Sequence, residues 1–296
     1  MRLEDVKRVG VLGCGLMGSG IAQVCAQNGY DVYVRELSSG LLARGLGSIK
    51  ESIYKHMVEK GKIRNEQAEA ILSRIKGTVD MAEAVMNVDI VIETVPEDLE
   101  TKKEVFAEVE KSSPHHTIFA SNTSSLMITE IASAIKRKEK LIGMHWFYPP
   151  QVMKLIEVTR GMLTSDETYN IINEFSVKLG KVPVASRDSP GFVVVRLLTG
   201  FMADAIRCVE AGLMSLEDID KACKLGLNHP MGPFELMDFT GLDTYLRIYE
   251  YIFKRTGDPR FHPPLLLEKM VATGHLGRRS GRGFYHYDSE RPTNEK

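Results

Sequence analysis

The sequence VGVLGCGLMGSG, residues 9–20, decides the expected fold. It places Gly13, Gly15 and Gly18 as G-x-G-x-x-G directly after an apolar run and at the start of a helical segment. The first glycine permits a tight turn, the second lets the backbone approach a pyrophosphate, and the third allows close packing of helix on strand. Free N–H groups at the start of the helix favour the anion. Residues 9–20 therefore predict a dinucleotide-binding turn in an α/β sheet.

An acidic residue ends the next predicted strand, residues 31–36. Glu36 lies about 20 residues beyond the glycines, where a carboxylate hydrogen-bonds the 2′-hydroxyl of the adenosine ribose. The same charge repels a 2′-phosphate, so we expect the cofactor to be NAD rather than NADP. The expected cofactor contacts in this region are Gly13, Gly15, Leu16, Met17, Gly18 and Glu36.

Apolar runs and helical segments alternate through the first two-thirds of the chain, which predicts a doubly wound, mostly parallel sheet. The expected strands are 8–12, 31–36, 89–95, 117–122, 141–146, 154–159 and 182–186, with helices at 17–28, 100–111, 125–136 and 166–179 and a helical hairpin at 38–75. From residue 192 to about 275 the pattern is helical. We therefore expect a Rossmann-type NAD-binding domain at 1–188 and an all-α domain at 189–296.

Composition excludes several classes of partner. The 296 residues include 38 basic and 39 acidic side chains, a net charge of -1, so no bulk field attracts nucleic acid or a membrane surface. The four cysteines show no zinc-ligand spacing, which fits a reducing compartment and no metal site. The charged N-terminus is unlike a secretory signal, and no apolar run is long enough to span a bilayer. We expect a cytoplasmic protein.

Polar residues follow or end several of the predicted strands. These stretches are ETVPED at 93–98, SNTSS at 121–125, HWFY at 145–148, and Glu157 within the next strand. Ligands of open α/β sheets bind beyond the carboxyl ends of the strands, so we expect hydroxyl, imidazole and carboxylate groups in one crevice. This set suits hydride transfer from an alcohol, in which a base takes the hydroxyl proton as hydride leaves for a nicotinamide.

Five segments together resemble the L-3-hydroxyacyl-CoA dehydrogenase family, which includes the 3-hydroxybutyryl-CoA dehydrogenases. They are GCGLMGSGIAQ, SNTSSL, MHWFYPPQVMKLIEV, DSPGFVVVRLL and NHPMGPFELMDFTGLD, and the resemblance continues to GRRSGRGFYHYD near the end. It implies reversible oxidation of a (3S)-3-hydroxyacyl-CoA thioester to the 3-oxoacyl-CoA, in fatty acid metabolism. It also implies a homodimer formed through the helical domain, whose segment FVVVRLLTGFMADAI is apolar nearly all round and must be covered.

The resemblance also implies the catalytic residues. His145 is the expected general base, Glu157 orients its other ring nitrogen, and Ser124 hydrogen-bonds the substrate oxygen. Alternatively, His145 is a satisfied core histidine, and Ser124 caps a helix that starts at Ser125.

Further contacts follow by position in the family pattern. Glu97, Lys102 and Arg279 match residues that contact the cofactor, although Lys102 is alternatively a helix-face charge and Arg279 a surface charge. Ser124 and Tyr148 belong to the same expected cofactor set.

The hairpin after the second strand is where the family contacts coenzyme A. Ser52 matches one such contact. A lysine expected seven residues later is Glu59 here, with Lys60 adjacent and Lys55 one turn before, so both lysines are candidates.

The chain departs from the family pattern at two positions. HWFYP replaces the usual HFFNP, which puts Tyr148 beside the expected base, and PGFVVVRL replaces PGFIVNRL, which puts Val195 in the expected substrate site. A lost hydrogen bond to substrate costs roughly 1–3 kcal/mol. Tyr148 brings its own hydroxyl, and Thr199 lies one helical turn beyond Val195. We expect a dehydrogenase with an altered acyl pocket.

Two other interpretations remain open from the sequence. A sugar-acid dehydrogenase of the gulonate type shares the fold and the His–Glu pair but needs no coenzyme A contacts. A redox-silent NAD-binding protein, as lens crystallins of this superfamily are thought to be, would tolerate Tyr148 and Val195.

Overall fold

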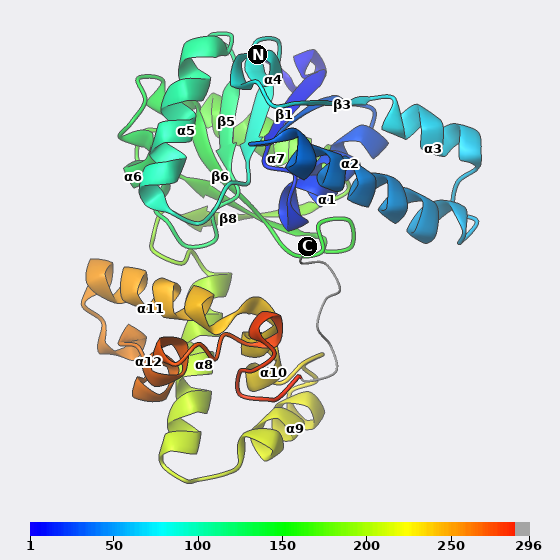
Figure 1. Cartoon of the computed structure of the whole chain (residues 1–296). Helices are drawn as coiled ribbons and strands as arrows, with labels where there is room; N and C mark the ends of the chain where they lie inside the picture. Colours follow the sequence, from blue (N-terminus) through cyan, green and yellow to red (C-terminus); the bar gives the residue numbers. More distant parts are fainter. Residues whose placement is uncertain (288–296) are drawn as a thin grey trace. The chain divides into compact units, whose positions relative to one another are not determined.

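The computed structural model describes residues 1–287 and divides the chain into two compact units. The first unit extends from Met1 to Phe192, and the second begins at Val193 (Figure 1). Residues 288–296 of the predicted helical domain lie outside the described residues. Within residues 1–287, no helix combines the length and the apolar character needed to cross a membrane.

The first unit is built on an eight-stranded sheet with the order β3-β2-β1-β4-β5-β6-β7-β8. Every neighbouring pair is parallel except β6 and β7, which are antiparallel. Strands β1, β4, β5 and β6 are almost wholly buried, as apolar runs in a covered parallel sheet should be. The strands are β1 (Arg8–Leu12), β2 (Asp31–Arg35), β3 (Ile75–Thr78), β4 (Ile90–Glu93), β5 (Ile118–Ser121), β6 (Leu141–Trp146), β7 (Leu155–Arg160) and β8 (Val182–Arg187).

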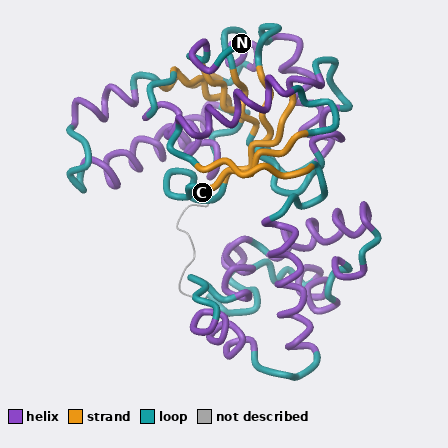
Figure 2. Tube along the Cα trace, turned by 180° about the vertical axis from the view of Figure 1, so that it is seen from behind, coloured by secondary structure: helices purple, strands orange, loops and turns teal. Residues whose placement is uncertain are grey.

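Helices lie on both faces of this sheet, which is seen as the run of orange strands between purple helices in Figure 2. Their bounds are α1 (Leu16–Gln27), α4 (Met81–Val85), α5 (Leu99–Ser112), α6 (Ile128–Ala132) and α7 (Asp166–Lys178). The predicted hairpin consists of α2 (Ser39–Ile53), the π-helix η2 (Tyr54–Val58) and α3 (Asn65–Leu72). Single 3₁₀ turns are η1 (Leu3–Asp5) and η3 (Lys138–Lys140). The predicted fold class is confirmed.

Two local predictions were wrong. The sequence predicts no strand between the hairpin and residue 89, yet β3 begins at the last residue of the predicted hairpin; its sequence IKGT carries no apolar pattern, and it pairs with β2 at the edge of the sheet. The helix predicted at 125–136 is shorter than expected. Helix α6 contains only residues 128–132, because the residues before it donate their backbone N–H groups to side chains instead. Its first N–H groups are bound by a distant carboxylate: Ile128 and Thr129 donate to Asp188 at 2.7 and 2.8 Å.

The second unit is helical and packs around Met202, Phe234, Met237 and Tyr249. Its helices are α8 (Val194–Glu210), α9 (Leu216–Gly226), α10 (Pro233–Thr240), α11 (Leu242–Thr256) and α12 (Leu265–Ala272), with the 3₁₀ turns η4 (Pro259–Phe261) and η5 (Arg278–Ser280).

Two buried carboxylates organise the second unit. Asp220 accepts hydrogen bonds from the backbone N–H groups of Phe234 and Glu235 at 2.8 and 3.1 Å and so caps α10. Asp238 accepts from Phe284 and Tyr285, both at 2.9 Å, and thereby attaches the segment after η5 to α10. Both aspartates are 1% exposed. The family-like segments NHPMGPFELMD and GRGFY therefore have a structural role in this unit.

Candidate active site

The glycine turn has the geometry that a dinucleotide requires. Gly13 has φ 95°, a conformation that favours glycine, and a Cβ at Gly18 would collide with the carbonyl oxygen of Gly13. A Cβ at Gly15 would meet no atom within 4 Å, so this side of the turn is open. Gly15 is the N-cap of α1, which begins at Leu16, and it has no side chain that could bind the first N–H groups of the helix. These residues fit a pyrophosphate held by backbone N–H groups.

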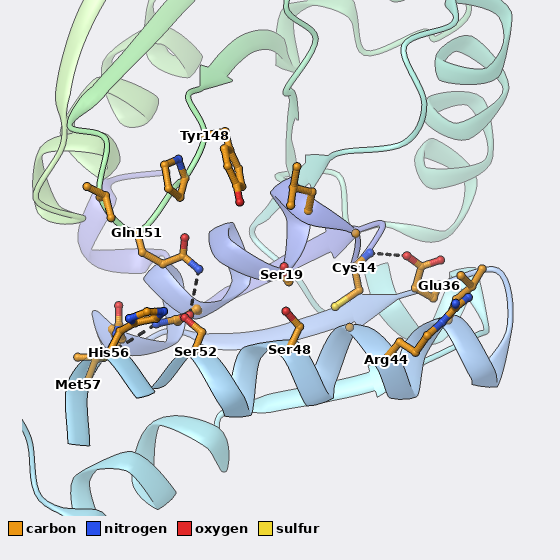
Figure 3. Close-up of a pocket in the computed structure, with 18 of the residues that line it drawn as sticks. Cys14, Ser19, Glu36, Arg44, Ser48, Ser52, His56, Met57, Tyr148 and Gln151 are labelled. Atoms are coloured by element: carbon orange, nitrogen blue, oxygen red, sulfur yellow. Dashed lines mark hydrogen bonds between the residues drawn. The ribbon is translucent and has the colours of Figure 1, made fainter. Parts of the chain in front are cut away.

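Glu36 is held beside this turn. Its Oε1 accepts from the backbone N–H of Cys14 at 2.6 Å, and its Oε2 accepts from that of Leu37 at 3.0 Å (Figure 3). The carboxylate is thus fixed where β2 ends, as an acid that recognises a ribose must be. Burial, with the charge of Glu36 adding to it, raises the pKa of the Cys14 thiol to about 12, so this cysteine is a neutral space-filling side chain.

A cavity of about 800 Å³ opens between α1, the α2–η2 segment and the turn after β6 (Figure 3). Gly15, Leu16 and Glu36 line it, and so do Ser52 and Lys60. Some of the residues expected to bind NAD and some of those expected to bind coenzyme A therefore share one cavity in the first unit. Lys55 is exposed on the hairpin and is not part of the cavity lining.

The cavity also has lining residues that sequence reasoning missed. Arg44 and Ser48 precede Ser52 at intervals of four residues on α2, so the three side chains share one helix face, and His56 continues it into η2. Figure 3 shows these side chains along the hairpin side of the cavity. Counting back one turn at a time from Ser52 would have found them.

Tyr148 contributes to the same cavity from the turn after β6. Its side chain is 44% exposed and lies at the cavity edge (Figure 3). Gln151 follows in this turn and donates to Gln23 of α1 at 3.1 Å. The turn that carries Tyr148 is therefore attached to the helix that begins at the glycine turn.

His145 and Glu157 form a buried pair. They face each other in the antiparallel register of β6 and β7, and Nδ1 of His145 lies 2.7 Å from Oε2 of Glu157. His145 is 6% exposed and Glu157 is 1% exposed. Within residues 1–287, the Nε2 atom of His145 has no hydrogen-bond partner. A carboxylate at Nδ1 fixes the tautomer in which Nε2 carries the free lone pair.

Ser124 lies in a turn that is wrapped around one carboxylate oxygen. Oε1 of Glu97 accepts from the backbone N–H groups of Ser124 and Ser125 at 2.9 and 3.0 Å. It also accepts from the hydroxyls of Thr123, Ser124 and Ser125 at 2.6, 3.2 and 3.0 Å. The alternative that Ser124 caps a helix starting at Ser125 is wrong, because α6 begins only at Ile128.

Lys102 is buried between two carboxylates. Its Nζ lies 2.6 Å from Oε1 of Glu93 and 3.3 Å from Oε2 of Glu97, and its side chain is 1% exposed. Burial would lower the pKa of Lys102, but the two carboxylates outweigh it and raise this pKa. Burial would likewise raise the pKa of Glu97, yet Lys102 and the hydrogen bonds from the turn hold that pKa below its usual range. Lys102 is therefore an interior cation rather than a charge on an exposed helix face.

The Ser124 turn and the His145 strand are directly connected. Asn122 accepts a hydrogen bond from the backbone N–H of Trp146 at 2.9 Å, and β5 pairs with β6. His145 and Glu157 thus lie on the neighbouring strands β6 and β7, Ser124 lies in the turn after β5, and Glu97 and Lys102 lie after β4, in the loop and on α5.

The remaining predicted residues belong to the second unit. Val195 lies on α8 and packs against the cluster of Ile248, Ile252 and Phe261. Thr199, one turn further, is fully buried, and its backbone carbonyl accepts from the hydroxyl of Tyr249 at 2.7 Å. Arg279 forms an ion pair with Asp243.

Comparison with family models matches residues 8–189 to the NAD binding domain of 3-hydroxyacyl-CoA dehydrogenase and residues 191–287 to the C-terminal domain of that family. The chain belongs to the 3-hydroxyacyl-CoA dehydrogenase family. The resemblance drawn from the five sequence segments is confirmed, as is NAD as the cofactor.

Individual relatives match along nearly their whole length. The chain is 45% identical over 280 residues to a probable 3-hydroxybutyryl-CoA dehydrogenase of Deinococcus radiodurans, covering 95% of this chain and 100% of the relative. It is 44% identical over 287 residues to a human mitochondrial hydroxyacyl-coenzyme A dehydrogenase, covering 95% and 91%. Among solved structures, an (S)-3-hydroxybutyryl-CoA dehydrogenase of Ralstonia eutropha has a TM-score of 0.91 at 39% identity, covering 96% and 99%.

Proposed function

We propose that the protein oxidises the 3-hydroxyl of a (3S)-3-hydroxyacyl-CoA to the 3-oxoacyl-CoA, reversibly, with NAD as the hydride acceptor. The observation that carries this proposal is the buried His145–Glu157 pair on the sheet whose first βα turn has dinucleotide-binding geometry. Bound NAD supplies the hydride chemistry, and the protein supplies the proton transfer and the orientation.

His145 acts as the general base. Its Nε2 takes the proton of the substrate hydroxyl, while Nδ1–H stays hydrogen-bonded to the Glu157 carboxylate at 2.7 Å. The negative charge of Glu157 stabilises the imidazolium that forms, and its position keeps the ring oriented. In the reductive direction, the same nitrogen returns the proton to the oxygen.

Ser124 orients the substrate oxygen. Its hydroxyl contact with Glu97, at 3.2 Å, is the longest of the five to that carboxylate oxygen, so the Ser124 O–H can turn to donate to the substrate oxygen while the substrate's own proton goes to His145. The backbone N–H of Ser124 donates to the same carboxylate and keeps the residue in place.

Coenzyme A binds along the hairpin side of the cavity. Ser52 and Ser48 offer hydroxyls, and Lys60 and Arg44 offer cations, which are the groups that bind phosphates. Tyr148 and Val195 each stand where the family pattern usually has asparagine, and these two replacements alter the acyl specificity.

We further propose a homodimer, supported by exposed apolar side chains of the helical unit such as Leu197, 70% exposed, and Leu225, 81% exposed. The four free cysteines support a cytoplasmic location, and the acyl-CoA substrate supports a role in fatty acid metabolism.

The test is NADH formation with purified protein, NAD and a panel of (3S)-3-hydroxyacyl-CoAs, beside a His145→Ala variant. We expect turnover on at least one thioester and a loss of about 10²- to 10⁴-fold in the variant. Turnover of free gulonate with none on any thioester would replace the proposal by a sugar-acid dehydrogenase. Tight NADH binding without turnover of either class would make the protein a redox-silent binder.

A further inference from the structure

Glu93 is a fully buried carboxylate that the proposed mechanism does not use. It is the last residue of β4 and is 0% exposed. Its Oε1 accepts from Lys102 Nζ at 2.6 Å and from the backbone N–H of Val95 at 2.8 Å, and its Oε2 accepts from the hydroxyl of Ser121 at 2.6 Å. A buried charge is costly unless it is paired and hydrogen-bonded, and here both oxygens are satisfied.

The partners of Glu93 lead to both ends of the Ser124 turn. Ser121, which donates to Glu93, also accepts from the backbone N–H of Thr123 at 3.3 Å. Lys102 reaches Glu97 at 3.3 Å, and the other oxygen of Glu97 binds Ser124. Glu93 therefore acts on Ser124 by two routes, one through Ser121 and one through Lys102 and Glu97.

The charges explain why a second carboxylate is needed. Lys102 lies between Glu93 and Glu97, so its position is set by attraction from both sides. Without the charge of Glu93, the ammonium would be drawn toward Glu97 alone. Glu97 holds the turn through one oxygen only, so a shift of its carboxylate moves every donor attached to it.

We propose that Glu93 is a positioning residue for the dehydrogenase reaction: through Lys102 and Ser121 it fixes the Glu97 carboxylate and thereby the Ser124 hydroxyl. This inference rests on the proposed function for its kinetic consequence. Its structural consequence, an ordered turn at 123–125, holds whatever the substrate is.

The test compares Glu93→Gln with the wild type and with Glu104→Gln, an exposed glutamate on α5, as the matched control. Glutamine keeps the shape of the side chain and removes its charge. We expect kcat to fall about 10- to 100-fold, with KM for NAD within about threefold, because a small displacement near the chemistry costs rate rather than remote binding. Glu104→Gln should match the wild type.

A second measurement does not depend on turnover. The amides of Ser124 and Ser125 donate to Glu97, so hydrogen exchange there should accelerate about tenfold in Glu93→Gln, while the amides of Ile90–Ile92 in β4 stay protected. If Glu93→Gln does not fold, Ser121→Ala removes one donor to Glu93 and should show the same changes more weakly.

The outcomes separate the two proposals. A wild type that turns over a thioester, with a Glu93→Gln variant of lower melting temperature but unchanged kcat and exchange, overturns the positioning role. A wild type without thioester turnover overturns the proposed function, and the exchange at Ser124 and Ser125 still decides whether Glu93 orders the turn.

Discussion

The carboxylate of Glu157 lies 2.7 Å from Nδ1 of His145, directly across the antiparallel pair of β6 and β7. Because the two residues are opposite each other in the register, their side chains lie on the same face of the sheet. Because Glu157 is 1% exposed and His145 is 6% exposed, water does not compete for this hydrogen bond. The reversal of strand direction at β7 in an otherwise parallel sheet is what creates the pair.

The first prediction concerns Glu157→Gln. The amide removes the negative charge that stabilises an imidazolium and can donate to Nδ1, which favours the tautomer with the proton on Nε2. We expect kcat to fall about 10²- to 10⁴-fold with a smaller change in KM, measured by NADH formation. Glu174→Gln, an exposed residue of α7, should be unchanged. A Glu157→Gln variant with wild-type kcat would mean that His145 needs no orienting acid.

The second prediction concerns Val195→Asn. If the altered acyl pocket arises from the missing amide, restoring it should raise kcat/KM on a short straight-chain 3-hydroxyacyl-CoA. One regained hydrogen bond of about 1–3 kcal/mol corresponds to a gain of about 5- to 150-fold. Leu197→Asn places the same amide on α8 at a residue that is 70% exposed and should give no gain. Equal activity of Val195→Asn and wild type would count against the altered-pocket hypothesis.

The third prediction concerns the buried cation Lys102. Replacement by methionine leaves the Glu93 carboxylate buried without its counter-charge, so unfolding free energy near neutral pH should fall by about 3–5 kcal/mol in denaturant titrations. Lys103→Met is the control, because Lys103 pairs with Glu100, which is 72% exposed, and such a pair contributes about 1 kcal/mol or less.

The pH dependence of this difference follows from the direction of the pKa shifts. The pKa of Glu97 is lowered by Lys102, so this stabilisation is present above the ordinary carboxyl pKa of 4.5 and is lost as pH falls through the lower folded value. The pKa of Lys102 is raised, so its contribution persists below 10.5 and is lost as pH rises through the higher folded value. The difference in unfolding free energy between wild type and Lys102→Met should therefore become smaller at low pH and at high pH. A difference that stays constant from acid to base would contradict a charged Lys102 paired with charged carboxylates.

The sequence predicted what depends on local pattern and missed what depends on distant partners. The glycine turn, the buried strands and the hairpin follow from spacing and apolar runs within short windows. The length of α6 is set by Asp188, a residue 60 positions away from Ile128, and no local pattern contains that contact. Strand β3 pairs with β2, which lies about 40 residues earlier in the chain, and no short window of sequence contains that pairing.

The candidate site divides in the same way. His145, Glu157 and Ser124 could be proposed from family motifs, and the structure brings the first two into contact and places the third on the neighbouring turn. Glu93 stood within the ETVPED segment, but only the three-dimensional contacts of Lys102 show that it is paired. Burial of a lysine cannot be read from a helix that is polar along most of its length, as α5 is.

The fourth prediction concerns Asp238→Asn in the helical unit. Asp238 accepts from the backbone N–H groups of Phe284 and Tyr285 and from the hydroxyl of Tyr287. An amide turns one acceptor into a donor that faces other donors, which should cost about 1–3 kcal/mol of unfolding free energy. Limited proteolysis should then cut the segment after η5 faster than in wild type. Asp204→Asn, on an exposed face of α8, is the control.

The pKa of Asp238 also predicts how the stability of the protein changes with pH. Burial raises the pKa of this carboxyl despite its hydrogen bonds, so its contribution to stability is full below the ordinary pKa of 3.8 and is lost as pH rises through the folded value. Because asparagine does not titrate, the unfolding free energy of Asp238→Asn should lack this pH dependence in denaturant titrations. Identical pH profiles of the variant and the wild type would contradict the raised pKa.

The last prediction decides between the two candidate lysines of the hairpin. Lys60 lines the cavity together with Ser52, whereas Lys55 is exposed outside its lining. A cation that binds a phosphate of coenzyme A equally in the ground and transition states affects KM and leaves kcat alone. We therefore expect Lys60→Met to raise KM for the acyl-CoA about two- to fivefold at unchanged kcat, in line with an exposed charge pair of at most about 1 kcal/mol. The effect should shrink at high salt, where screening weakens such contacts. Lys55→Met should change KM less than Lys60→Met at every ionic strength, and the reverse order would transfer the contact to Lys55.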